Sequence, residues 1–66
     1  MNWDIIEGKW EQLKGGAKEK WGDLTDDEVT EMEGKRDKIV GKLQEKYGWT
    51  KEKAENEVDS FFTEKV

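Results

Sequence analysis

The densest group of residues that could do chemistry is a run of carboxylates near the middle of the chain. Asp23, Asp26, Asp27 and Glu28 stand close together, and oxygen ligands of this kind are what Ca²⁺ prefers. A calcium loop needs its ligands at alternating positions around a turn-forming glycine, and this run contains no glycine. Asp26 and Glu28 are also explained as the first turn of a helix that Thr25 caps. The sequence therefore predicts no metal site here.

The side chains on which catalysis most often depends are missing. The chain has no cysteine and no histidine, so it has no thiolate nucleophile or ligand and no imidazole base. Its glycines are not spaced as in a loop that cradles phosphate. Its carboxylates fall on helix faces that we expect to be solvated, where nothing would raise their pKa. We therefore expect no enzymatic activity and no cofactor.

A stripe of lysines along one side of a predicted helix is the main candidate for binding: Lys35, Lys38, Lys42 and Lys46. Such a stripe could contact nucleic-acid phosphates or an anionic membrane surface. The net charge of −5, with six acids and no base in residues 23–33, would repel both kinds of partner. The favoured explanation is structural, because acids near a helix start and bases near its end complement the helix dipole.

Two adjacent phenylalanines form a second candidate surface. Phe61 and Phe62 cannot both face inward from one helix, so we expect one of them to be exposed and open to a partner. Trp3, Trp10 and Trp21 could in principle lie in a membrane interface. So small a chain needs these tryptophans for its core, which is the interpretation that we prefer.

Apolar residues at helical spacing predict a first amphipathic helix from about residue 3 to 21: Trp3, Ile6, Trp10, Leu13, Ala17 and Trp21. The pair Gly15-Gly16 inside this helix predicts a bend or the close approach of another backbone. Gly22 is expected to end the helix.

A capping box starts the second predicted helix, with Thr25 as the cap and Glu28 at the third helical position. Leu24 is placed to pack on Val29 as a hydrophobic staple. The apolar pattern continues through Gly34, which favours one helix over residues 26–47; a break near Gly34 is the main alternative.

Gly48 is expected to end the second helix, and Thr50 to cap a third over about 51–64. The apolar face of this third helix consists of Ala54, Val58, Phe61 and Phe62. The short glycine turns predict an all-α bundle of antiparallel helix hairpins, with three helices if 26–47 is continuous.

An internal repeat of about 26 residues underlies this pattern. Glu33-Gly34-Lys35 echoes Glu7-Gly8-Lys9, and Gly41 and Gly48 correspond to Gly15 and Gly22. One helical unit used twice is therefore expected, within a single domain over residues 1–66. No apolar run is long enough to span a membrane, and no signal peptide follows Met1, which predicts a soluble cytoplasmic protein.

Four motifs stand in an order typical of one family: Trp10-Glu11-Gln12-Leu13-Lys14-Gly15, Lys20-Trp21-Gly22-Asp23-Leu24-Thr25-Asp26-Asp27, Glu33-Gly34-Lys35-Arg36-Asp37 and Val40-Gly41-Lys42-Leu43-Gln44-Glu45-Lys46-Tyr47-Gly48. On these motifs the chain resembles the CsbD-like family of small bacterial stress-response proteins over nearly its whole length. The resemblance implies induction under general or osmotic stress, no established molecular activity and no catalytic residues. It also implies a SAM-like bundle of four or five short helices, which favours the break near Gly34.

The expected function is that of a non-enzymatic stress-response protein, either protective or acting through a protein partner that the sequence does not identify. The alternative is a binding module for nucleic acid or a membrane surface. The residues expected at an interaction surface are Lys35, Lys38, Lys42, Lys46, Phe61 and Phe62.

Overall fold

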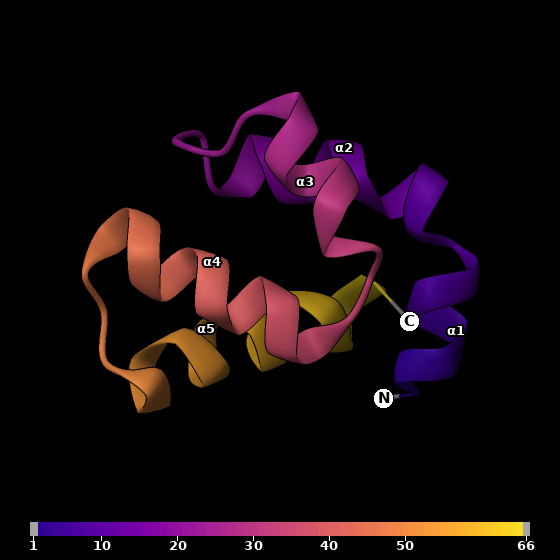
Figure 1. The fold of residues 1–66 in the computed structure, drawn as a ribbon. Helices are drawn as coiled ribbons and strands as arrows, with labels where there is room; N and C mark the ends of the chain where they lie inside the picture. The colour runs from indigo at the N-terminus through magenta and orange to yellow at the C-terminus, as the bar shows by residue number, and fades with distance from the viewer. Residues whose placement is uncertain (1, 66) are drawn as a thin grey trace.

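The computed structural model describes residues 2–65, with side chains described through residue 63, and folds this part of the chain into five helices (Figure 1). They are α1 (Trp3–Gly8), α2 (Trp10–Lys20), α3 (Asp26–Met32), α4 (Arg36–Tyr47) and α5 (Lys51–Lys65). Within residues 2–65 there is no strand. The predicted all-α class is confirmed, and the five helices are the largest number that was expected.

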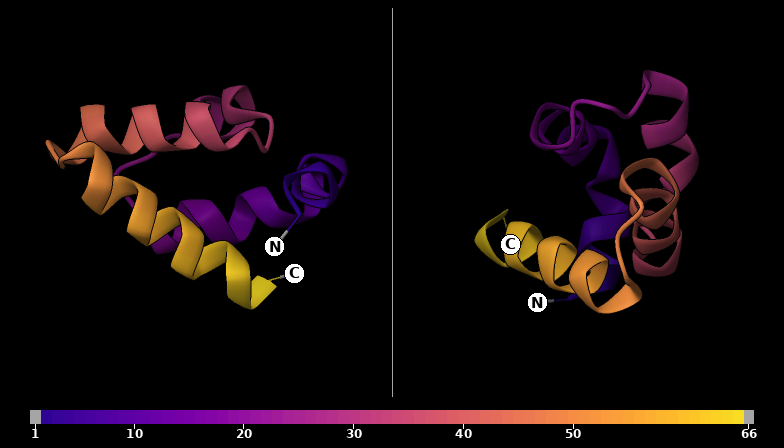
Figure 2. Two further views of the ribbon diagram at one scale, coloured as in Figure 1. Left: turned by 90° about the horizontal axis from the view of Figure 1, so that it is seen from below. Right: turned by 90° about the vertical axis from the view of Figure 1, so that its left-hand side faces the viewer.

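Side chains from all five helices contribute to one hydrophobic core. Figures 1 and 2 show how the helices are arranged. α4 and α5 form a helix hairpin around the turn that follows Tyr47, and α3 packs on α2. The first and last helices also meet, because the rings of Trp3 and Phe62 lie 5.3 Å apart. The core is thus closed by residues from both ends of the chain.

The prediction of one helix over residues 3–21 is wrong, because the chain bends at Lys9 between α1 and α2 (Figure 2). Lys9 has φ −107° and ψ 14°, and its N–H is shared between the carbonyls of Ile5 and Ile6. Gly8 weakens the helix at this point. The bend lets the two helices run in different directions while Ile6 and Trp10 both reach the core.

The expected bend or backbone approach at Gly15-Gly16 is also wrong. α2 runs through both glycines without interruption. A Cβ atom at Gly15 would have no atom within 4 Å, and one at Gly16 would meet only the Phe61 ring, at the ordinary contact distance of 3.6 Å.

The close backbone approach occurs at Gly34 instead, where the predicted continuous helix over 26–47 is broken. Glu33 and Gly34 both have left-handed backbone, with φ of 55° and 75°. A Cβ atom at Gly34 would lie 2.8 Å from the Cα of Glu7 and 3.0 Å from the carbonyl oxygen of Ile6. The alternative of a break near Gly34 is therefore confirmed, and its cause is that the backbone of α1 occupies the space of a side chain.

The predicted helix ends are largely confirmed. Thr25 Oγ1 accepts a hydrogen bond from the N–H of Glu28 at 3.1 Å, and Glu28 Oε1 accepts one from the N–H of Thr25 at 2.9 Å, which completes the capping box. Thr50 Oγ1 accepts from the N–H of Lys53. Gly48 ends α4 in the left-handed conformation, with φ 69°. Gly22 follows Trp21, the C-cap residue of α2, and does not have a positive φ.

Only apolar side chains are buried among those that the structure describes. Phe62 is completely buried, and its ring packs against those of Trp3, Trp10 and Trp21. The buried apolar side chains among those described are Ile6, Trp10, Ala17, Trp21, Leu24, Val29, Met32, Ile39, Val40, Leu43, Ala54, Val58 and Phe62. All four expected apolar positions of the last helix are either in this set or, for Phe61, packed against it.

Candidate interaction surface

Three of the four stripe lysines lie beside α3 and pair with its acids. Lys38 Nζ is 2.6 Å from a carboxylate oxygen of Glu33, and Lys46 Nζ is 2.8 Å from one of Glu28. Lys42 lies 3.8 Å from Glu28 and 3.9 Å from Glu45. Two acids of residues 23–33, Glu28 and Glu33, therefore pair with the lysine stripe, a contact that the helix-dipole explanation did not include.

Lys35 stands apart from the other stripe lysines. It is the residue that precedes α4, its side chain is exposed, and it makes no ion pair with the described part of the chain. Its charge still contributes to lowering the pKa of Glu33, after the larger effects of the hydrogen bond and charge of Lys38. Lys35 is thus the one stripe lysine that forms no ion pair with the described residues.

Glu28 is the centre of the α3–α4 contact. The hydrogen bond from Lys46 and then that from the Thr25 backbone lower the pKa of Glu28 from 4.5 to about 2. The same hydrogen bond from the other side raises the pKa of Lys46. One carboxylate therefore both caps α3 and ties it to the last turn of α4.

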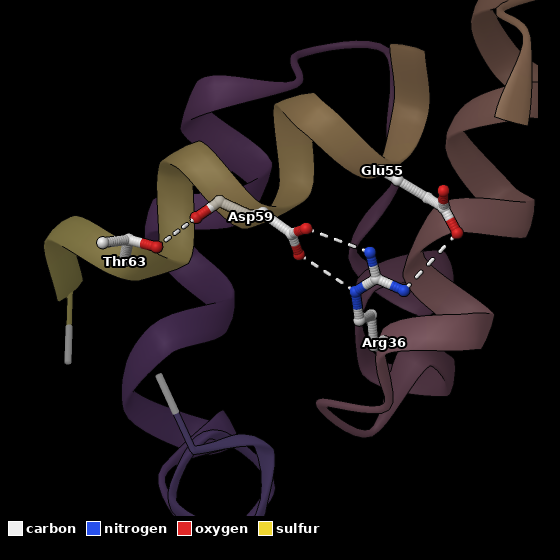
Figure 3. A network of polar contacts seen from close by, with 4 residues as sticks. All are labelled: Arg36, Glu55, Asp59 and Thr63. Atoms are coloured by element: carbon white, nitrogen blue, oxygen red, sulfur yellow. Dashed lines mark hydrogen bonds and ion pairs between the residues drawn. The ribbon is translucent and has the colours of Figure 1, made fainter. Parts of the chain in front are cut away.

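A second ionic contact holds α4 to α5 (Figure 3). The guanidinium of Arg36 donates to both carboxylate oxygens of Asp59, at 2.9 and 3.0 Å, and lies 3.5 Å from a carboxylate oxygen of Glu55. Asp59 is fixed on α5, where its backbone carbonyl also accepts a hydrogen bond from Thr63 at 2.6 Å. The hydrogen bond to Asp59 is the main cause of the raised pKa of Arg36.

The phenylalanine pair does not leave a fully exposed ring. Phe62 is buried, and Phe61 is half-buried with its ring 5.1 Å from that of Trp21. The expectation that one of the two is exposed is therefore wrong. The two rings stand at 87° to each other and 4.9 Å apart, an edge-on arrangement in which adjacent positions on one helix both reach the tryptophans.

The carboxylate run does not converge on a metal site. Asp26 pairs with Lys18 at 3.2 Å, and Glu28 is committed to Lys46 and the helix cap. In the part of the chain that the structure describes, no three acids are grouped so that they could hold a metal ion.

A surface aromatic cluster was not identified from the sequence. The rings of Tyr47 and Trp49 stack at 4.6 Å, and Lys53 Nζ lies 5.1 Å from the Trp49 ring centre. The turn at Gly48 brings these side chains together, so a glycine stop with an aromatic residue on each side was the available signal.

Two grooves flank α3, and a glycine lies in each. The groove towards α4 is lined by Met32, Gly41 and a ring of charged side chains, and the groove towards α2 is lined by Gly15, Val29 and a smaller charged set. A Cβ atom at either glycine would have no atom within 4 Å. Neither glycine therefore packs against a neighbouring element; each leaves open space on its helix.

The described residues include no helix with the length and apolar character that crossing a bilayer requires.

Comparison with known proteins places these features in a family. UPF0337 protein PA4738 of Pseudomonas aeruginosa is 59% identical over 61 residues, covering 92% of this chain and 94% of the relative. UPF0337 protein YjbJ of Escherichia coli O6:H1 is 59% identical over 61 residues, covering 92% and 88%. UPF0337 protein ECA0631 of Pectobacterium atrosepticum is 60% identical over 58 residues, covering 88% and 84%. Because the family's sequence pattern also matches residues 4–56, this chain belongs to the CsbD-like family, whose bacterial relatives carry the name UPF0337.

Proposed function

We propose that this protein is a non-enzymatic stress-response protein that acts through noncovalent contacts of its folded surface. The observation that carries the proposal is the distribution of polar groups. Among the described residues, every polar or charged side chain is at least partly exposed to solvent, and every buried side chain is apolar. Catalytic sites often bury the acids and bases that they use, and none of the described acidic or basic side chains is buried. The stress-response part of the proposal rests on what resemblance to the CsbD-like family implies; the chain matches that family over residues 4–56.

The composition of the surface supports a protective role or a role as a partner of another protein. Charged residues make up 44% of the chain, and the net charge is −5. Such a surface holds water strongly and keeps the protein from associating with itself. A protective protein needs both properties, because it must stay dissolved at high concentration while it keeps water beside a protein that is losing its own hydration.

The protective role is tested by drying, or freezing and thawing, a labile enzyme together with this protein. Equal masses of albumin and of the Gly41→Pro variant are the controls. Proline inside α4 should cost ~3 kcal/mol or more and unfold the domain without changing its charge. We expect more enzyme activity to survive with the native protein than with either control. Equal survival with albumin would refute protection.

The role through a partner is tested by capture from stressed cells on the immobilised protein, again with the Gly41→Pro variant as control. A partner that recognises the fold should be retained by the native protein alone. Equal retention by both forms would show that the captured protein responds to charge and not to structure.

Binding to nucleic acid or to a membrane through the lysine stripe stays a secondary hypothesis. The ion pairs of Lys38, Lys42 and Lys46 with carboxylates reduce the charge available to phosphates. A titration with DNA and RNA at about 20 mM salt, followed by tryptophan fluorescence, tests the first partner because electrostatic binding is strongest there. Co-sedimentation with anionic liposomes tests the second. No response in both would remove this hypothesis.

A further inference from the structure

We propose that the groove between α3 and α4 docks a lysine- or arginine-bearing segment of a partner protein. The inference rests on the proposed function, since it gives the chemistry of a partner for the folded surface. It is carried by the shape of the groove and by the charges that line it.

The glycine at position 41 lines the groove without a side chain to fill it. The groove has a volume of about 780 Å³, within the ~300–1,000 Å³ typical of ligand pockets. Gly41 is exposed in the middle of α4, where a Cβ atom would have no atom within 4 Å. Met32, which is almost completely buried, also lines the groove. An apolar side chain of a partner could therefore lie over Gly41 and Met32.

The lining of the groove carries an excess of negative charge. It includes five carboxylates and two lysines: Glu28, Glu31, Glu33, Asp37, Glu45, Lys38 and Lys42. Both lysines already pair with carboxylates of the lining, and acids remain in excess even when Lys46 beside them is counted. The excess falls on both walls, because Glu31 on α3 and Asp37 on α4 are exposed and make no ion pair with described residues.

This charge selects among occupants. Nucleic acid and anionic lipid would be repelled. A metal ion would need three converging acids, which the described residues do not provide. A second copy of this chain carries a net charge of −5 and would bring further carboxylates. A cationic polypeptide segment with apolar side chains complements both the charged and the apolar parts of the lining.

The groove between α2 and α3 supplies a contrast within the same molecule. Its volume is only about 250 Å³, and its two acids and two lysines pair with each other, Lys14 with Glu11 at 3.1 Å and Lys18 with Asp26 at 3.2 Å. Gly15 lies in it as Gly41 lies in the other. A substitution at Gly15 is therefore a matched control for one at Gly41.

The experiment measures the binding of a dye-labelled amphipathic peptide of lysine and leucine by fluorescence anisotropy at physiological salt. A twin peptide with glutamate in place of lysine shows whether the charge matters. We expect Gly41→Gln, which fills the groove without changing its charge, to weaken binding ~10-fold, and Gly15→Gln to change it less than ~2-fold. Replacing both uncommitted acids, Glu31→Gln with Asp37→Asn, should weaken binding ~5-fold or more.

Folding is checked by circular dichroism and thermal melting. Glutamine has a higher helix propensity than glycine, so a weaker binder that melts no earlier than the native protein has lost its site and not its fold. If Gly41→Gln unfolds, the double variant Glu31→Gln with Asp37→Asn alone tests whether the peptide binds in the groove.

Three results would overturn the proposal: no binding of the lysine peptide by the native protein, equal binding by the native protein and Gly41→Gln, or a dimer that Gly41→Gln dissociates in sedimentation. The last result would assign the groove to a second copy. The enzyme-protection assay is independent of these results. A native protein that outperforms albumin but ignores the peptide refutes the docking site alone, and one that binds the peptide but protects nothing refutes only protection.

Discussion

At the scale of single residues, Gly34 is under the tightest steric constraint. Its φ of 75° favours glycine, and the backbone of Glu7 stands 2.8 Å from where a Cβ atom would be. We expect Gly34→Ala to lower the free energy of unfolding by about 2–4 kcal/mol, since it combines backbone strain with a clash that no side-chain rotation relieves. Urea denaturation followed by tryptophan fluorescence measures the change.

Gly41→Ala is the matched control for that substitution. Gly41 lies inside a regular helix with open space around it, so alanine should raise the free energy of unfolding by about 0.5–1 kcal/mol. Equal effects of the two substitutions would contradict the contact between Gly34 and α1.

The indole N–H of Trp10 makes a buried hydrogen bond, so loss of this bond should lower the stability of the fold. Trp10 Nε1–H donates to the carbonyl of Val29 at 2.8 Å. That carbonyl lies in the last turn of α3 and has lost its usual helical donor, because the N–H of Glu33 bonds to Thr30 instead. We expect Trp10→Phe to cost about 1–3 kcal/mol, which thermal melts would measure.

Trp3→Phe separates the hydrogen bond from the loss of ring area. Trp3 is half-buried and packs edge-on against Phe62 without a hydrogen bond from its indole. A cost for Trp3→Phe as large as that for Trp10→Phe would show that ring size, and not the bond to Val29, sets the effect.

At the scale of helices, Glu28 makes the α3–α4 contact depend on pH. Its folded pKa of about 2 lies below the ordinary 4.5, so the unfolded chain binds a proton at this carboxyl more readily than the folded chain does. The stabilisation is complete above pH 4.5 and is lost as the pH falls from 4.5 towards 2. Urea midpoints measured over this range should therefore fall with pH.

Glu28→Gln tests the assignment of that dependence. Glutamine can still accept the hydrogen bond from the N–H of Thr25, but it has no charge for Lys46. We expect the variant to show a shallower dependence on pH between 4.5 and 2. An unchanged dependence would assign the loss at low pH to other carboxylates, among them Glu33, whose pKa is also lowered.

The Arg36–Asp59 contact should contribute to holding α4 on α5. Its two parallel hydrogen bonds suit arginine and not lysine. Because both side chains are partly exposed, we expect a coupling of only about 0.5–1.5 kcal/mol in a double-mutant cycle of Arg36→Gln and Asp59→Asn. The ion pair of Lys14 and Glu11 on α2, which has one N–O contact, should show a coupling energy below ~0.5 kcal/mol. Equal couplings would show that the forked geometry adds nothing.

The helix boundaries show what local sequence could and could not predict. Caps depend on neighbouring residues, so the Thr25 box and the Gly48 stop were predictable. The breaks at Lys9 and Gly34 were harder because the apolar spacing passes through both. Each break falls in a Glu-Gly-Lys sequence, and the second exists because the backbone of α1 lies against Gly34, a contact between segments far apart in the chain. The recurring tripeptide was the available signal.

At the scale of the whole molecule, the interaction surface was the least predictable feature. The lysine stripe follows from helical spacing alone, but its pairing with Glu28 and Glu33 depends on the turn at Gly34 that folds α4 back beside α3. The groove lies between the same two helices, and Gly41 lines it without a side chain. A pattern along one helix cannot predict a surface that two helices make.

The whole fold depends on Phe62, since its ring joins the first, second and last helices. It is completely buried and contacts the rings of Trp3, Trp10 and Trp21. Phe62→Ala should cost about 3–5 kcal/mol, whereas a domain of 66 residues has a total stability of only about 3–10 kcal/mol. We therefore expect Phe62→Ala to be largely unfolded at 37 °C by circular dichroism, while Phe61→Ala, at a half-buried position, stays folded. Similar melting of the two variants would mean that the tryptophans form a core without Phe62.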